Sequence, residues 1–514
     1  MPLLNLISFI GIFALCAIAW FFSENRDLKY FPWRVTIWGI GLQLVLGFLV
    51  FWFPPTKFIL NAFSKLLDSI FIAADAGARF VFGPALIPPI GEIPTPGIGT
   101  IFAFRVLPTV IFFAGLMALL YNIGVIQPIV NFFAKVFYSA MRLSGAESLS
   151  GAANIFVGIE AAIVVKPFLA KMTRSELCAI LACCFGTAAS STLAIYVRAL
   201  QDVFPNILVH LVSASIIAIP ACFVLSKILV PETEVPLTAG GIPVESATET
   251  VTTVDEDGVP TETVAGEPLE RMSPVDAAIV GTLDGLKMAV TIAAVLIFIL
   301  GIVSLVNQLF GGLASLQTSD NALLQPIGAF FSIVTLENIL GVLFLPLTVL
   351  TGVSFEWNEI WTSSVLIGSR LLKTAIPPYQ QLGLLGAQGL VSDRVILIVS
   401  YALSGFAHLA SVGIFVGGTI ALIPSRRKDI SELGWKALFI GTLATIMISC
   451  VAGVFDTGDA SILGERKAPT APITAPASPG ATTPGVPSAS PTVTPPPPPT
   501  TVPQLLTPAA SPSP

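Results

Sequence analysis

The sequence predicts an all-α polytopic membrane protein with about eight transmembrane helices, interfacial helices and two re-entrant hairpins. The 514 residues are 54% hydrophobic and 11% charged, with a mean hydropathy of +0.86, whereas a soluble domain carries about 25% charged residues. Apolar windows of bilayer-spanning length recur along the chain. The segments between them are too polar or too rich in Gly and Pro to cross as straight helices, which leaves interfacial helices and re-entrant hairpins.

The eight apolar windows lie at about 3–22, 35–53, 102–121, 176–198, 208–229, 288–310, 393–423 and 435–455. The amphipathic or broken segments lie near 57–82, 126–142, 145–170, 327–352 and 355–388. The first window has no basic region before it, so it is interpreted as a transmembrane helix rather than a cleaved signal.

Basic residues predict the orientation of the bundle. They cluster at 26–34, 166–174 and 426–428, and the positive-inside rule assigns all three clusters to the cytoplasm. We therefore expect a multi-pass protein of the cell (inner) membrane with both termini outside. The acidic segment 231–273 is predicted to be a disordered cytoplasmic linker. The Pro/Ser/Thr-rich segment 458–514 is predicted to be an extended extracytoplasmic tail.

The composition argues against several classes of function. There is no basic patch outside short turns, so nucleic-acid binding is not expected. The six cysteines lie in apolar helical surroundings typical of small core residues, and the chain has only two histidines. No catalytic constellation and no phosphate-binding glycine loop occurs. The sequence therefore predicts neither an enzyme nor a bound cofactor or metal, apart from a coupling ion.

The stretch from Ser144 to Glu160 has the strongest functional pattern. It places glycines, serines, Asn154 and two carboxylates between apolar segments, and broken helices at bilayer depth hold solutes or ions. Glu160 has no nearby basic partner in sequence, which favours a functional role. Two roles remain open for Glu147: a functional one, or a structural one at a helix end or beside a lysine.

A short internal repeat relates the two halves of the chain. Residues 184–190 (CFGTAAS) match residues 405–411 (GFAHLAS), and each copy follows a polar segment and a charged turn. Paired broken helices are the usual pointer to a transporter's midplane site. Thr187 and Ser190 either face an ion beside unwound carbonyls, which suits Na⁺, or bond back to their own helix and bend it.

The second half offers residues for a planar ligand. Two consecutive prolines leave backbone groups free to bind a ligand, and an aromatic ring supplies a flat surface for a planar ligand. The candidates are Thr374, Pro377, Pro378, Tyr379, Phe406, His408 and Ser411. His408 is predicted to line the site, whereas Phe406 taken alone is typical of core packing. His210, at the start of a span, is predicted to be a satisfied or interfacial histidine.

Several blocks resemble the concentrative nucleoside transporter family in collinear order over about residues 35–455. They include Ala74–Gly83, Arg105–Pro108, Ser144–Gly158, Met172–Leu177, Thr335–Gly341, Gly405–Ala407 and Arg426–Ile430. The resemblance implies a homotrimer with a scaffold domain and an inverted-repeat transport domain that moves like an elevator. It also implies two hairpins that meet near the midplane, and uptake of nucleosides driven by Na⁺ or H⁺.

The resemblance also assigns residues by position. The Na⁺ site would comprise the side chains of Asn154 and Thr187 and backbone oxygens of Val157 and Ala188. The substrate site would comprise Gly158, Glu160, Thr374, Phe406, His408 and Ser411, with Glu160 facing the base.

The first hairpin and two single positions depart from the family pattern. The first hairpin, at residues 158–162, is one residue shorter than the pattern and lacks its Gln and Thr. Ala375 stands where the family has a ribose-binding Glu, and His408 stands where it has an Asn. Losing a charged hydrogen-bond partner costs about 1.5–3 kcal/mol, so sugar recognition is predicted to be rewritten.

The resulting hypothesis is a symporter for nucleosides or related nucleobase-containing solutes, coupled to Na⁺ or, alternatively, H⁺. The alternatives are the same fold carrying a non-nucleoside solute, and a non-transporting membrane receptor or scaffold. The predicted regions are 1–55 (N-terminal helices), 56–142 (scaffold), 143–230 (first hairpin and half-repeat), 231–273 (linker), 274–353 (scaffold and interfacial helices), 354–457 (second hairpin and half-repeat) and 458–514 (tail).

Overall fold

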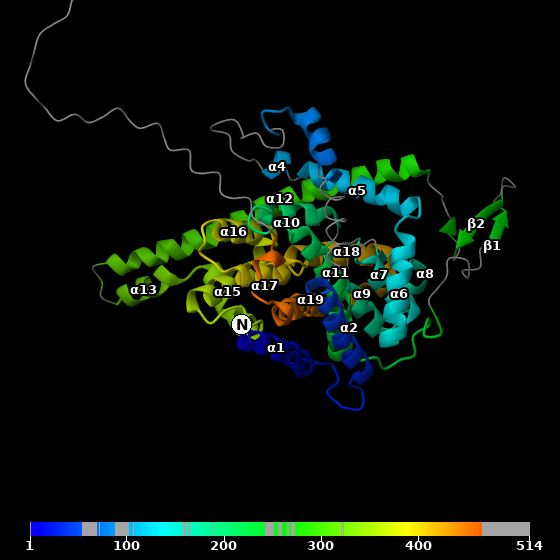
Figure 1. The fold of residues 1–514 in the computed structure, drawn as a ribbon, viewed down its shortest axis with the longest axis horizontal. Coiled ribbons are helices and arrows are strands. Elements are labelled where there is room, and N and C mark those ends of the chain that lie inside the picture. Colours follow the sequence, from blue (N-terminus) through cyan, green and yellow to red (C-terminus); the bar gives the residue numbers. More distant parts are fainter. Residues whose placement is uncertain are drawn as a thin grey trace, which may run out of the picture. The chain divides into compact units, whose positions relative to one another are not determined.

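The computed structural model of the chain is mostly helical (Figure 1). It describes residues 2–53, 69–70, 72–87, 102–105, 107–156, 158, 161–162, 165–188, 190–241, 251–254, 260–264, 267–268, 273–319, 321 and 323–464. The helices are α1 (Pro2–Phe21), α2 (Trp33–Phe51), α4 (Phe102–Arg105), α5 (Leu107–Asn122), α6 (Gln127–Met141), α7 (Gly145–Ala153), α8 (Lys166–Leu169), α9 (Arg174–Gly186), α10 (Ser190–Leu200), α11 (Ile207–Leu229), α12 (Pro274–Ala314), α13 (Gln325–Ile333), α14 (Leu336–Leu350), α15 (Trp357–Lys373), α16 (Ile376–Ala387), α17 (Asp393–Leu403), α18 (Leu409–Leu422) and α19 (Arg427–Phe455). A further helix covers residues 72–82.

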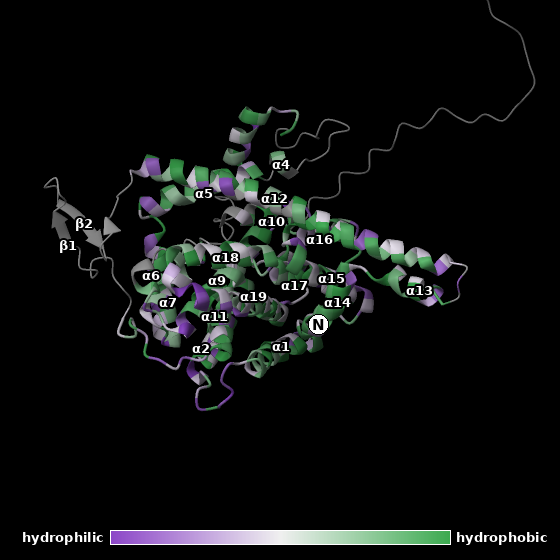
Figure 2. Cartoon of the chain, turned by 180° about the vertical axis from the view of Figure 1, so that it is seen from behind, coloured by the Kyte–Doolittle hydropathy of each residue, from purple (hydrophilic) through white to green (hydrophobic). Residues whose placement is uncertain are grey.

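The centre of the bundle is formed by α11 and α19. The spanning window of α11 is 89% buried and that of α19 is 83% buried. Both pack against α1, α2, α9 and α17. Figure 2 shows hydrophobic residues along most of these helices and hydrophilic residues in the loop between α1 and α2. The bundle therefore buries its two central long helices and leaves polar residues in the loop between α1 and α2.

Within the described residues, five helices are long and apolar enough to cross a membrane: α1, α2, α11, residues 297–318 and residues 424–455. The bent pairs α5–α6 (79°) and α13–α14 (65°) raise the number to as many as seven. The all-α polytopic prediction is confirmed. The predicted windows 176–198 and 393–423 are not continuous spans, because α9–α10 and α17–α18 are each interrupted.

Helices α5 and α12 pack along each other at the edge of the fold (Figure 1). Glycines allow this approach: a Cβ on Gly285 would lie 2.7 Å from Ala114 Cβ, and one on Gly281 would lie 2.9 Å from Ala114 O. Small residues are the usual means by which membrane helices approach closely. In contrast to α11, the spanning window of α12 is only 6% buried. The pair is thus joined by backbone contact while most of α12 stays uncovered.

Two of the three predicted basic clusters meet at one end of the bundle, beside Glu24, which lies two residues before the third. Arg174, at the start of α9, forms ion pairs with Glu24 (2.9 Å) and Glu432 (2.7 Å), and Lys436 also pairs with Glu24. Burial alone would raise the pKa of Glu24, but the hydrogen bonds and charges of Arg174 and Lys436 outweigh it and lower that pKa. Arg426 Nη1 donates to Met172 O at 2.9 Å. The convergence agrees with a common membrane side for the clusters.

A second polar cluster joins the other end of α1 to the bundle. The guanidinium of Arg394 in α17 donates to Asp456 Oδ2 at 2.8 Å, Asn5 Oδ1 at 2.9 Å and Gly352 O at 2.9 Å. It also reaches Ser8 Oγ at 3.2 Å. Arg394 and Asp456 are almost fully buried. The cluster ties α1, α17 and the end of α19 together.

Two segments predicted to be disordered contain structure. Gly145 N donates to Thr238 O at 2.9 Å and Ala146 N donates to Thr238 Oγ1 at 3.1 Å, so the start of the acidic linker covers the start of α7. Further along the linker, β1 (Val251–Val254), β2 (Pro260–Val264) and β3 (Glu267–Pro268) form an antiparallel sheet. Ile462 and Leu463 of the predicted tail are buried. The rest of the tail, 465–514, lies outside the described residues.

Candidate functional site

The first hairpin begins with a strongly capped helix. Ser144 Oγ accepts from Glu147 N at 3.2 Å, and Glu147 Oε2 accepts from Ser144 N at 3.0 Å, which together form a capping box. The other carboxylate oxygen of Glu147 lies 2.5 Å from Lys227 Nζ in α11. Glu147 thus has the structural role that the sequence left open: it holds the helix end and pairs with a lysine.

Asn154 lies directly after α7 and is fully buried. Its Nδ2 donates to Ser150 O at 3.2 Å, while its Oδ1 has no hydrogen-bond partner among the described residues. A buried side-chain oxygen without a donor is uncommon and calls for an explanation such as a bound ion. Of the neighbouring predicted residues, Gly158 O accepts from Ala161 N at 3.1 Å. Val157 and Glu160 lie outside the described residues.

The first broken helix ends at Gly186, and Thr187 follows it in extended conformation. Thr187 Oγ1 donates back to Cys183 O at 2.8 Å, which is the helix-bending role that the sequence left open. Its carbonyl oxygen accepts from Phe406 N at 3.2 Å. Ala188 is buried in the break. The backbone of the first break is therefore bonded directly to the backbone of the second.

The second broken helix ends at Leu403 and resumes at Leu409 with His408 as its N-cap. His408 Nδ1 accepts from Ser411 N at 3.3 Å, and Ser411 Oγ lies 3.1 Å from the same nitrogen. The half-buried Phe406 ring stands edge-on to the His408 ring, with 6.0 Å between centroids. His408 and Ser411 are thus brought together with Phe406, and both contribute to the cap of α18.

The two breaks cross at a glycine. A Cβ on Gly405 would lie 2.6 Å from Thr445 Cγ2, 2.8 Å from Gly186 O and 2.9 Å from Phe185 O. The internal repeat of the sequence falls on this crossing: its first copy spans the end of α9, and its second copy spans the break before α18. The similarity of the two copies therefore coincides with two helix interruptions that pack against each other.

The second hairpin turns between α15 and α16 at Thr374. Thr374 has φ 65° and ψ 179°, a region occupied almost only by glycine, and its buried Oγ1 has no partner among the described residues. Ala375 is fully buried. Pro377 and Pro378 lie in the first turn of α16, where no backbone donor is needed. Strained backbone of this kind is typical of functional sites.

Tyr379, predicted to form a wall for a planar ligand, packs within the protein. Its ring stacks on Tyr196 of α10 at 4.5 Å between centroids, and its hydroxyl donates to Ser400 O at 2.6 Å. The side chain is fully buried. Its faces are therefore used to join α10 and α16, and Phe406 is the aromatic residue of the predicted set that keeps partial exposure.

Family comparisons agree with this arrangement. Models described as the N-terminus and C-terminus of Na⁺ dependent nucleoside transporters match residues 10–85 and 210–453, and one described as nucleoside recognition matches residues 103–202. The uncharacterized transporter YutK of Bacillus subtilis is 33% identical over 451 residues, covering 87% of this chain and 98% of YutK. The chain belongs to the concentrative nucleoside transporter family.

Other members of the family extend the comparison. Mouse solute carrier family 28 member 3 is 30% identical over 464 residues, covering 88% of this chain and 59% of that protein. The structure of CNTnw in an inward-facing substrate-bound state is similar with a TM-score of 0.74 at 32% identity, over 90% of this chain and all of that one. This member of the family is accordingly a multi-pass membrane protein and a transporter rather than an enzyme.

His210 has the satisfied role that the sequence predicted. Its Nδ1 lies 3.0 Å from the hydroxyl of Tyr401, and its Nε2 lies 3.1 Å from Ile462 O. Because a carbonyl oxygen can only accept, Nε2 carries the proton and Nδ1 accepts from Tyr401. His210 therefore anchors the residues after α19 to α11.

Sequence reasoning missed Arg370. This residue lies in α15, four positions before Thr374, and is only 1% exposed. Its Nη1 donates to Ala402 O and to Thr445 Oγ1, the latter at 2.9 Å. The signal was present, because an arginine inside a predicted re-entrant segment is costly enough to indicate function.

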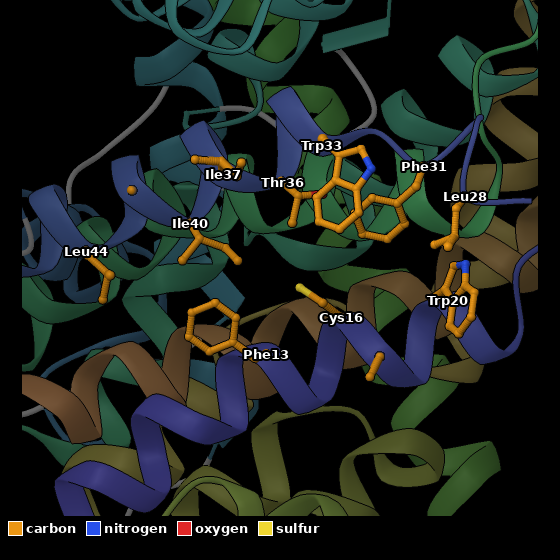
Figure 3. A pocket seen from close by; sticks show the side chains of 12 residues that line it. Phe13, Cys16, Trp20, Leu28, Phe31, Trp33, Thr36, Ile37, Ile40 and Leu44 are labelled. Carbon is orange, nitrogen blue, oxygen red and sulfur yellow. The ribbon is translucent and has the colours of Figure 1, made fainter. Parts of the chain in front are cut away.

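An apolar groove lies apart from these residues, between α1 and α2 (Figure 3). Its cavity volume is about 560 Å³, and its walls include Phe13, Cys16, Trp33, Thr36 and Ile40. No charged side chain lines it, and none of the predicted site residues takes part. A polar solute would lose its hydrogen bonds there, so the groove is not a candidate for the transport site.

Proposed function

We propose that this chain is a Na⁺-coupled symporter that imports nucleosides or related nucleobase-containing solutes by elevator-type alternating access. The family model is described as Na⁺ dependent, and mouse sodium/nucleoside cotransporter 1 is 31% identical over 467 residues. We further propose a homotrimer in the cell membrane, with the basic clusters in the cytoplasm and the C-terminal tail outside. The uncovered apolar face of α12 supports its use as a scaffold surface between protomers.

One observation carries the proposal: two broken helices cross at the hydrogen bond from Phe406 N to Thr187 O, and both breaks contain predicted site residues. A helix break at bilayer depth leaves carbonyls and N–H groups that only protein, water or a ligand can satisfy. The first break offers carbonyl oxygens for a cation, and the second offers the Phe406 ring and polar side chains for a solute. The hydrogen bond between the two breaks therefore connects the proposed ion site to the proposed substrate site.

The ion site is assigned to Asn154 Oδ1 and Thr187, with backbone oxygens of Val157 and Ala188. The Oδ1 atom of Asn154 is buried and has no donor among the described residues, which supports its use as an oxygen ligand of a hard cation. None of these four residues has a side chain that titrates near neutral pH. This supports Na⁺ over H⁺ as the coupling ion.

The substrate site is assigned to Gly158, Glu160, Thr374, Phe406, His408 and Ser411. The half-buried Phe406 ring supplies a face on which a nucleobase can stack. The cap at His408 holds polar atoms beside this ring, and the strained turn at Thr374 adds a buried hydroxyl with no partner among the described residues. The buried methyl of Ala375 supplies no hydrogen bond to a sugar diol, which favours related solutes beside ordinary nucleosides.

The proposal is tested by uptake into proteoliposomes with and without an inward Na⁺ gradient, against a panel of nucleosides and nucleobases. We expect Asn154→Ala and Thr187→Ala to abolish Na⁺-dependent uptake. Thr419→Ala is the matched control for Thr187, because Thr419 Oγ1 makes the same bond to the carbonyl four residues earlier, at 2.8 Å. Asn321→Ala, at an exposed position before α13, is the control for Asn154.

Unchanged Na⁺ dependence in both Asn154→Ala and Thr187→Ala would reject the ion site. If protein whose folding is verified takes up no compound in the panel, nucleoside transport is rejected. It would favour the alternative of a non-nucleoside solute or of a membrane receptor.

A further inference from the structure

The buried cations of this protein fall into two groups. Lys227 pairs with Glu147 at 2.5 Å, Arg394 with Asp456 at 2.8 Å, and Arg198 with Asp75 at 2.6 Å. Arg370 has no such partner: none of the described Asp and Glu residues forms an ion pair with it, although it is 1% exposed. Burying an unpaired charge costs several kcal/mol even after relaxation. Arg370 is thus the exception among cations that are otherwise neutralised.

The hydrogen bonds of Arg370 are also incomplete. A guanidinium has five N–H donors. Nη1 uses its donors on Ala402 O and Thr445 Oγ1, whereas Nε and Nη2 have no partner within the part of the chain that the structure describes. Ala402 lies in the last turn of α17, whose partial negative end offsets at most about half of a unit charge. An edge of the guanidinium is therefore left with free donors.

Among the described residues, the surroundings of Arg370 carry no negative charge. The described titratable side chains that interact with it electrostatically are Tyr196, Tyr379 and His408. Tyr196 and Tyr379 stack on each other, and the Tyr379 hydroxyl is already committed to Ser400 O. None of the three supplies an anion. A molecule that the transporter binds would supply the negative charge that the described residues lack.

Arg370 lies at the helix crossing. Its partner Thr445 also lines Gly405, whose Cα faces the carbonyl of Gly186 in the first break. Four residues after Arg370, just past the end of α15, the strained Thr374 has a buried Oγ1 with no partner among the described residues. The turn of the second hairpin thus contains an unpartnered hydroxyl as well.

We propose that Arg370 binds a carboxylate of the transported solute, so that the protein prefers acidic nucleobase-containing solutes over neutral nucleosides. Among the described residues, the unpartnered polar groups are of two chemical kinds. Asn154 has a free acceptor, which suits a cation, and Arg370 has free donors along one edge, which suit the two oxygens of a carboxylate. This inference rests on the proposed transport function and narrows its substrate class. A free anion such as chloride is the other source of the same negative charge.

The test uses the full chain in proteoliposomes with a Na⁺ gradient and two radiolabelled probes. Uridine and orotidine differ by one carboxylate on the pyrimidine ring. We expect orotidine to be taken up with the higher kcat/KM and to compete against uridine more strongly than uridine competes against itself. In Arg370→Gln the kcat/KM for orotidine should fall about tenfold or more, the scale of a lost charged hydrogen bond, while that for uridine changes less than about threefold. Arg370→Lys should retain part of the preference.

The other outcomes are equally decisive. Uptake of uridine without orotidine uptake or competition overturns this inference and leaves the proposed function standing. Uptake of orotidine alone supports the inference and restricts the proposed function. If Arg370→Gln lowers both activities equally, Arg370 only stabilises the end of α17, and the inference is overturned. If that variant does not fold, the comparison of the two probes on the wild-type protein decides. Uridine uptake that requires chloride, measured against methanesulfonate, overturns the assignment to the solute.

Discussion

The helix crossing makes Gly405 sensitive to a single added methyl group. In Gly405→Ala the new Cβ would lie 2.8 Å from Gly186 O and 2.9 Å from Phe185 O, and also 2.6 Å from Thr445 Cγ2. The two oxygens belong to backbone and cannot rotate away. The Thr445 side chain is held by bonds from Arg370 Nη1 and to Thr442 O. Relief therefore requires the two broken helices to separate.

Overpacking of a close-packed interior costs about 1–3 kcal/mol, which is the destabilisation expected for Gly405→Ala. The matched control is Gly413→Ala in α18, where a Cβ meets nothing within 4 Å. Replacing an unhindered helical glycine stabilises by about 0.5–1 kcal/mol. The assay is reversible unfolding in mixed detergent micelles, with Na⁺-dependent uptake measured on the same preparations. A Gly405→Ala protein with wild-type stability and full uptake would refute the close contact.

Two further predictions concern the polar clusters at the ends of the bundle. Removing one partner of a buried ion pair costs about 3–5 kcal/mol, so Arg394→Ala should lower the free energy of unfolding strongly. Adding Asp456→Ala should recover part of that stability, and a double variant as unstable as Arg394→Ala would contradict this. The control is Lys287→Ala, because the ion pair of Lys287 with Asp284 is exposed, with side-chain exposures of 78% and 62%. Its loss should lower the free energy of unfolding by under about 1 kcal/mol. The pKa of Glu24 is lower in the folded protein than its ordinary value of 4.5, so its stabilising effect is complete above that value and is lost as the pH falls through the folded pKa. The melting temperatures of wild type and Glu24→Gln should therefore differ at pH 7 and converge as the pH falls below 4.5 through the folded pKa. A constant difference would reject the role of its two basic partners.

The parts of the fold that could be predicted depend on local pattern. Long apolar windows located α1, α2, α11 and α19, because each helix is apolar over a spanning length. The mixed polarity of residues 355–388 predicted a broken segment, and α15 and α16 form a hairpin there. These features need no knowledge of distant contacts.

Other parts depend on contacts between distant residues and could not be predicted. The breaks within 176–198 and 393–423 lie in apolar sequence, and each is stabilised by the other through the bond between Phe406 and Thr187. Composition likewise gave no sign that Thr238 bonds the start of α7. The prediction that Tyr379 forms a wall for a planar ligand was wrong, because its stacking partner, Tyr196, lies far away in the chain.

The candidate site shows the same division. The family resemblance assigned Asn154 and Thr187 by position, and the structure brings the carbonyl of Thr187 against Phe406 in the second half of the chain. Glu147 was left open because its lysine, Lys227, is eighty positions away. That Arg370 has no acidic partner among the described residues is visible only in the structure, since an arginine in a broken helix would ordinarily be assumed to have a counter-ion.

The glycine contact between α5 and α12 has a consequence for what holds this pair together. Lipid tails are as apolar as the helix surfaces, so removing these surfaces from the bilayer yields little gain from the hydrophobic effect. Contact between Gly281 or Gly285 and the backbone of α5 gains dispersion energy instead, which is additive over many atoms and does not require water. The cohesion of this pair should therefore resist cooling, which weakens hydrophobic association. A single methyl group at Gly281 would remove it.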